Sequence, residues 1–94
     1  MRVYDFIWLP DVVEKLEAKH QVTTDEVEEV FFNQPRFRFM EKGRVQGEDM
    51  FSALGQTDAG RYLVVLFIFK PRDIALSISA RDMNAGERKR YGRK

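Results

Sequence analysis

Hydrophobic residues in the first third of the chain change from a run that only Asp5 interrupts to a helical spacing. The run Val3–Leu9 has the length of a strand and ends at Pro10, which cannot donate a hydrogen bond to a sheet. Apolar residues then recur at intervals of three and four, which predicts a helix over residues 11–20 and a second helix after Thr23. Thr23 and Glu26 have the spacing of a capping box, so the second helix has a defined start.

From Arg36 onward, polar and apolar residues alternate with a period of two, which is the pattern of strands. Arg36, Arg38 and Met40 alternate with phenylalanines, and the strand that they predict therefore has one polar face. Further extended segments are predicted at residues 48–54, 61–69 and 74–81. Gly55 is expected to break the first of these, and the second, apolar on both faces, is predicted to be a central strand.

The order of these elements predicts the fold class. A strand, two helices, a meander of strands and a final helix favour an α+β domain. In this arrangement the two N-terminal helices and the C-terminal helix pack on an antiparallel β-sheet. At this length, residues 1–94 are expected to form a single domain.

The stretch Ile74–Tyr91 joins the last strand to the final helix and is rich in arginine. The alternating pattern ends at Arg81, and Asn84 with Glu87 has the spacing of a second capping box. The strand end and the helix are therefore expected to bring Arg81 beside Glu87 and the basic run 88–90. Guanidinium groups match phosphate oxygens with paired donors, so this stretch is interpreted as a phosphate site or, alternatively, as a solvated basic tail.

The formal net charge of +1 hides opposite charges at the two ends of the chain. Residues 1–34 hold three basic and eight acidic side chains, a net charge of −5, whereas residues 81–94 hold six basic and two acidic ones, a net charge of +4. Such polarity suits a protein that contacts an anion at one end.

Several kinds of site are not expected from the composition. The chain has no cysteine and one histidine, which argues against disulfides and zinc sites, and it has no Walker loop, GxGxxG, HExxH or nucleophile elbow. Neither a metal nor another cofactor is therefore expected. The absence of cysteine makes a reducing cytoplasm the expected location. No apolar run is long enough for a signal peptide or a membrane span, so we expect no membrane partner.

Four polar side chains are candidates for chemistry, and each has a structural alternative. His20, beside Lys19, is the only imidazole and suits proton transfer near neutral pH, or it only satisfies the last carbonyls of its helix. Glu48 at the start of a strand is a base or an edge charge that opposes aggregation. Arg61 is a phosphate contact or a turn residue, and Tyr91 is an acid or an anchor between helix and sheet.

Four segments carry motifs that occur together in one order. They are Lys19-His20, Thr24–Phe32 (TDEVEEVFF), Gly55–Val65 (GQTDAGRYLVV) and Ile78–Tyr91 (ISARDMNAGERKRY). Together they resemble the BrnT family, the toxins of a bacterial type II toxin–antitoxin system. The resemblance covers nearly the whole chain, and the SAR…ER element of the last segment is its most specific part.

This resemblance implies a RelE-like ribonuclease fold and metal-independent endoribonuclease activity that inhibits translation. It also implies two partners, an RNA substrate and a cognate antitoxin whose ribbon-helix-helix domain would bind DNA. The residues implied in catalysis are His20, Glu48, Arg81 and Arg88, and those implied in substrate binding are Lys19, Arg61, Lys89 and Tyr91.

Two positions depart from the family pattern. The chain has Glu48-Asp49-Met50 where many members have Glu-x-Arg or Glu-Arg, and Gln21 replaces the usual glycine after the histidine. A single group that stabilises a phosphorane contributes on the order of 10²-fold in rate. The missing arginine therefore supports a second hypothesis, a non-catalytic, degenerate toxin-like domain that binds an antitoxin or RNA without cutting it.

Overall fold

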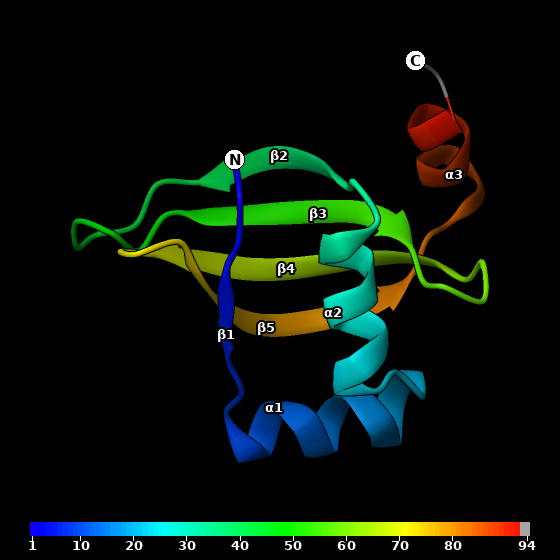
Figure 1. The fold of residues 1–94 in the computed structure, drawn as a ribbon, viewed down its shortest axis with the longest axis horizontal. Coiled ribbons are helices and arrows are strands. Elements are labelled where there is room, and N and C mark those ends of the chain that lie inside the picture. The colour runs from blue at the N-terminus through cyan, green and yellow to red at the C-terminus, as the bar shows by residue number, and fades with distance from the viewer. Residues whose placement is uncertain (93–94) are drawn as a thin grey trace.

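The computed structural model describes residues 1–92, and Arg93 and Lys94 of the basic C-terminal stretch lie outside the described residues. Three α-helices, one π-helical turn and five strands make up the described chain (Figure 1). The elements are β1 (Asp5–Ile7), α1 (Pro10–Lys15), the π-helical turn η1 (Leu16–His20), α2 (Thr24–Phe32), β2 (Arg36–Glu41), β3 (Met50–Gln56), β4 (Tyr62–Lys70), β5 (Ile74–Asp82) and α3 (Ala85–Gly92).

The five strands form one sheet in the order β1-β5-β4-β3-β2. Strands β2 to β5 are an antiparallel meander, and β4 is the central strand, as its apolar pattern predicts. The α+β prediction is confirmed, but the prediction of a purely antiparallel sheet is wrong, because β1 pairs with β5 in parallel. A hairpin turn would make neighbouring strands antiparallel, but β1 and β5 are not joined by one. The helices carry the chain from β1 to β2 at the opposite edge of the sheet, so β1 can pair with β5 in parallel.

Helix α2 packs on one face of the sheet (Figure 1). Val27 and Val30 are fully buried, and the ring of Phe31 meets the ring of Phe67 edge to face at a centroid distance of 5.0 Å. Strand β3 continues through Gly55, so the predicted break at this residue is wrong. A Cβ atom at Gly55 would lie 3.0 Å from Cγ1 of Val30, and glycine is therefore what allows the helix to approach the strand this closely.

The first predicted helix is divided into α1 and the π-helical turn η1. It ends at Gln21, whose φ of 54° is in the left-handed region. Glycine adopts this conformation without the steric cost that a Cβ atom imposes. The turn geometry thus gives a physical reason for the glycine that BrnT-like sequences usually have at this position.

Both predicted capping boxes are confirmed. The Glu26 amide donates to Oγ1 of Thr23 at 3.1 Å and the Thr23 amide donates to Oε1 of Glu26 at 3.0 Å. The Glu87 amide donates to Oδ1 of Asn84 at 2.8 Å and the Asn84 amide donates to Oε1 of Glu87 at 2.9 Å. Among residues 1–92, no helix is long and apolar enough to cross a membrane.

Candidate functional site

The side chains of β2 to β5 that point away from α2 form two parallel rows across the sheet. The first row is Arg36, Leu54, Val64 and Arg81, and the second is Arg38, Ser52, Leu66 and Ser79. Each row crosses four strands, which corresponds to roughly 14 Å between its ends. Arginines therefore stand at both ends of the first row, with apolar side chains between them.

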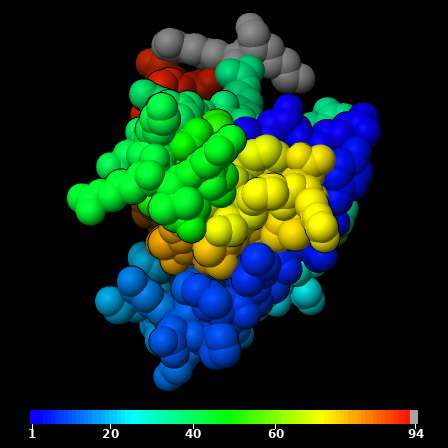
Figure 2. Space-filling model, turned by 90° about the vertical axis from the view of Figure 1, so that its left-hand side faces the viewer, coloured from blue at the N-terminus to red at the C-terminus, as the bar shows by residue number. Residues whose placement is uncertain are grey.

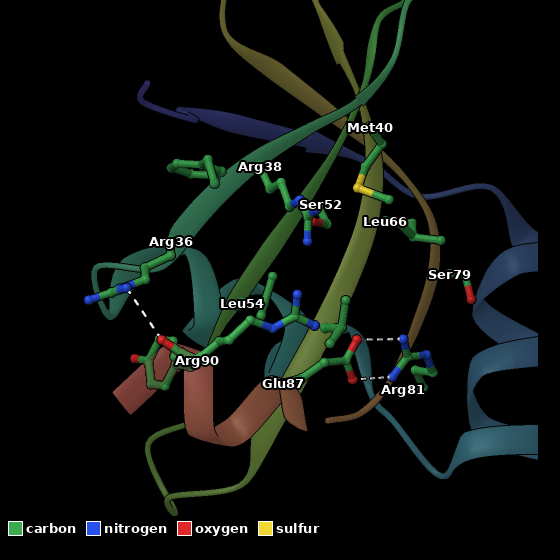
Figure 3. Close-up of a pocket in the computed structure, with 13 residues that line it drawn as sticks. Arg36, Arg38, Met40, Ser52, Leu54, Leu66, Ser79, Arg81, Glu87 and Arg90 are labelled. Atoms are coloured by element: carbon green, nitrogen blue, oxygen red, sulfur yellow. Dashed lines mark hydrogen bonds and ion pairs between the residues drawn. The ribbon is translucent and has the colours of Figure 1, made fainter. Parts of the chain in front are cut away.

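The two rows form the floor and walls of a cavity of about 400 Å³, which we call the basic cavity. Helix α3 closes one side of it with Glu87, Arg90 and Tyr91. Figure 3 shows Arg38 from β2 and Arg90 from α3 reaching into the cavity. Four arginines and one carboxylate line it, so the cavity has an excess of positive charge.

Among the described residues that line the cavity, Glu87 is the only carboxylate, and Arg81 holds it. The Nη1 and Nη2 atoms of Arg81 donate to the two carboxylate oxygens of Glu87 at 2.7 and 2.8 Å (Figure 3). The same carboxylate accepts the Asn84 amide, which caps α3. The hydrogen bond from Arg81 is the main cause that lowers the pKa of Glu87 to about 2, and it raises the pKa of Arg81. The pair thus fastens the end of β5 to the start of α3.

The other three arginines of the cavity have no such partner. Within residues 1–92, Arg36, Arg38 and Arg90 form no ion pair with a carboxylate. Nη1 of Arg36 donates only a long hydrogen bond, 3.5 Å, to the backbone oxygen of Arg90. Their guanidinium donors are therefore available to an anionic ligand.

Arg61 lies outside the basic cavity and holds the helical layer to the sheet. It donates to Oδ1 of Asp82 at 2.7 Å and to the carboxylate of Glu26 at 3.2 Å. It also donates to the backbone oxygens of His20 at 2.9 Å and Gln21 at 2.7 Å, which are the carbonyls that η1 leaves free at its end. The hydrogen bond with Asp82 raises the pKa of Arg61 and lowers that of Asp82.

The structure places His20 and Glu48 far apart. His20, with Lys19, ends η1 beside Arg61, next to the start of β4. The Glu48 carboxylate pairs with Nζ of Lys70 at 3.3 Å, at the other end of β4. At this end the loop between β2 and β3 (green) lies beside the turn between β4 and β5 (yellow; Figure 2). The nine residues of β4 span roughly 26 Å, so the two side chains cannot contact one phosphate.

The remaining candidates, Arg88, Lys89 and Tyr91, lie on α3. The Cζ atom of Arg88 is 4.3 Å from the centre of the Tyr62 ring, on which the guanidinium stacks, and the Tyr91 ring meets the same ring edge to face at 6.0 Å. Tyr91 lines both the basic cavity and an adjacent groove, whereas Arg88 and Lys89 line only the groove.

Of the cavity residues, Arg81, Glu87 and Tyr91 belong to the stretch that the sequence singles out, whereas Arg36 and Arg38 were missed as site residues. The alternation around Arg38 indicated only that this strand has one polar face. Met50 lies on the same face of β3 as Ser52 but does not line the cavity. The missing family arginine is thus next to the cavity rather than in it.

Two further observations bear on this site. In the part of the chain that the structure describes, no three His, Asp or Glu side chains gather as a metal site would require. A family profile described as "Ribonuclease toxin, BrnT, of type II toxin-antitoxin system" matches residues 8–87, which include all four cavity strands and Glu87. No curated protein is similar enough to the chain to count as a match.

Proposed function

The chain belongs to the BrnT family of ribonuclease toxins of type II toxin–antitoxin systems, and we propose that it binds single-stranded RNA in the basic cavity and cleaves it without a metal ion. Cleavage of RNA by such a toxin would inhibit translation. The observation that carries the proposal is the set of four arginines around an apolar floor on the face of the sheet opposite α2.

The cavity suits a flexible, single-stranded nucleic acid. Arg36, Arg38 and Arg90 offer forks of donors to phosphate oxygens, and the apolar floor gives a surface on which a base or a ribose can lie. At about 400 Å³, the cavity has room for a nucleotide or two but not for a duplex. The hydroxyl groups of Ser52 and Ser79 add polar contacts of the kind that RNA recognition uses.

We place the proton transfer on Glu87 because His20 and Glu48 lie outside the cavity. A phosphate that draws Arg81 toward itself removes the main cause of the low pKa of Glu87, and the carboxylate becomes a better base. Glu87 then accepts the proton of a ribose 2′-hydroxyl, the 2′-oxygen attacks phosphorus, and the bond to the 5′-oxygen breaks. Arg81 and its neighbours stabilise the extra charge of the phosphorane, and the departing 5′-oxygen takes a proton from water.

The ion pair between Arg81 and Glu87 also supports a second candidate function, RNA or antitoxin binding without cleavage. While Arg81 holds Glu87, the described residues that line the cavity include no free carboxylate and no imidazole. A protein in which phosphate does not displace Glu87 would bind RNA, or its antitoxin, without cutting. Binding and cleavage must therefore be measured separately.

The family also has an antitoxin partner. We propose that this antitoxin is a ribbon-helix-helix protein and that an acidic, apolar segment of it covers the basic cavity. Such a segment would meet both the arginines and the apolar floor, and it would exclude RNA by occupying the same donors.

Arg38→Ala tests the proposed site, with Arg44→Ala as a matched control. Arg44 is exposed in the loop between β2 and β3 and does not line the cavity. We expect Arg38→Ala to weaken RNA binding about tenfold, to lower the salt dependence by about one phosphate contact, and to slow cleavage by on the order of 10²-fold. Equal losses in both variants would show that only overall charge matters and would contradict the site.

A further inference from the structure

Beside the basic cavity lies a groove of about 590 Å³ that the proposed reaction does not use. Its lining residues come from the end of α2 and the turn after it, from the strands β2, β3 and β4, and from α3. We call it the polar groove. The residues that line only this groove and not the cavity include Asn33, Gln34, Gln56, Tyr62, Arg88 and Lys89.

We propose that the polar groove is a second subsite for RNA, which binds nucleotides next to those held in the basic cavity. The inference rests on the proposed function, because it assigns the groove to the same strand of RNA. With this subsite, the protein would bind a single strand several nucleotides long and not only the nucleotides on either side of the cleaved bond.

The two sites are adjacent. Arg36 and Tyr91 line both of them, so they form the wall that separates the cavity from the groove. Arg36 has no carboxylate partner within residues 1–92, and its long hydrogen bond to the backbone of Arg90 is easily replaced. A phosphate placed at Arg36 would thus lie between a nucleotide in the cavity and the next one in the groove.

The charge of the groove favours an anionic strand. Arg36, Arg88 and Lys89 contribute three positive charges, and no carboxylate lines the described groove. This differs from the cavity, where Glu87 offsets one arginine. Phosphates are therefore the groups that the groove attracts most strongly.

The uncharged side chains of the groove can contact bases. Nδ2 of Asn33 donates to the backbone oxygen of Gln56 and to Asp58, both at 2.9 Å, which leaves its Oδ1 atom as an acceptor. The Gln34 side chain is exposed and forms no hydrogen bond within residues 1–92. Arg88 already stacks on Tyr62, and a guanidinium plane on an aromatic ring is a surface on which an unpaired base stacks.

The length of the RNA provides the test, with oligonucleotides that are 2′-O-methylated so that they cannot be cut. The double variant Gln34→Gly, Lys89→Ala removes two side chains of the groove. Because Gln34 has a φ of 53°, glycine fits its backbone without strain. The matched control is Gln46→Gly, Lys42→Ala, which makes the same changes in the exposed loop between β2 and β3.

Wild type is expected to bind an octanucleotide at least about tenfold more tightly than a dinucleotide, which fits in the cavity alone. The double variant should weaken the octanucleotide about tenfold and the dinucleotide less than about twofold, and the control should change neither. If the octanucleotide binds no more tightly than the dinucleotide, or if the double variant lowers the affinity for both equally, the groove is not an RNA subsite although the cavity still binds RNA. If neither oligonucleotide binds, the proposed function itself fails; if only antitoxin affinity falls in the double variant, the groove serves the protein partner instead.

Discussion

Glu87→Gln separates the three roles that the structure gives to one carboxylate. Glu87 caps α3, neutralises Arg81 and, in the proposed reaction, accepts the proton of the 2′-hydroxyl. Glutamine has nearly the same size and keeps an oxygen that can accept the Asn84 amide. The substitution therefore removes the charge of Glu87 and its basicity while the cap retains an acceptor.

The effect on stability follows from the pKa of Glu87, which falls from an ordinary value of 4.5 to about 2 in the folded protein. This difference corresponds to at most roughly 3 kcal/mol of folding free energy, and because the Arg81 side chain is 46% exposed, screening by solvent reduces it to about 1–2 kcal/mol. A lowered pKa stabilises the fold fully above pH 4.5. The stabilisation is lost as the pH falls toward 2, so the gap between wild type and variant should close in that window.

Glu87→Gln should strengthen the binding of RNA but slow its cleavage. Loss of the Glu87 charge leaves Arg81 free for phosphate, and we expect roughly fivefold tighter binding, or about 1 kcal/mol. Cleavage should fall by on the order of 10²-fold or more, because an amide cannot accept the proton.

The measurements are chemical denaturation between pH 2 and pH 7, a binding titration with 2′-O-methylated RNA and single-turnover cleavage of unmodified RNA. Glu14→Gln is the matched control, since Glu14 is exposed on α1 and forms no ion pair within residues 1–92. Unchanged cleavage by Glu87→Gln would refute its role as the base. Weaker binding of RNA would refute the idea that Glu87 competes with phosphate for Arg81.

Three further predictions address residues inside and outside the cavity. Arg61→Ala should lower the free energy of unfolding by about 2 kcal/mol, or the thermal midpoint by roughly 10 °C, because it leaves the carbonyls of η1 and two carboxylates without their donor. RNA affinity per folded molecule should stay at the wild-type value. A large loss of affinity in a fully folded sample would instead make Arg61 an RNA contact. His20→Ala should retain cleavage within about threefold of wild type in a single-turnover assay, and a loss of 10²-fold would return the proton transfer to the imidazole. Arg36→Glu combined with Arg38→Glu should weaken antitoxin binding at low salt by at least about tenfold, as measured by calorimetry, whereas unchanged affinity would place the antitoxin on another face.

The parts of the fold that depend on neighbouring residues were predicted from the sequence. Both capping boxes form as their spacing predicts, and Arg81 meets Glu87 because a strand end and a helix start are separated by only a few residues. The central position of β4 followed from its apolar composition. In each case the pattern that carried the prediction lies within a stretch of nine residues or fewer.

The parts of the fold and of the site that depend on residues far apart in the sequence were not predicted. Arg36 and Arg81 are brought into one row by the register of four strands, which no local pattern specifies. For the same reason the sequence did not show that His20 and Glu48 lie at opposite ends of β4. The parallel pairing of β1 and the close contact at Gly55 likewise depend on where the helices cross the sheet.

Analysis of the cleavage products in EDTA shows whether this chain cuts RNA at the basic cavity. Wild type is expected to convert single-stranded RNA in one turnover into fragments that end in a 2′,3′-cyclic phosphate and begin with a 5′-hydroxyl, because the 2′-oxygen is the nucleophile. Arg81→Ala should bind this RNA more weakly and should release those fragments on the order of 10²-fold more slowly. RNA that is bound by wild type but remains intact would contradict cleavage and would favour the binding domain, and fragments formed equally fast by Arg81→Ala would contradict the site.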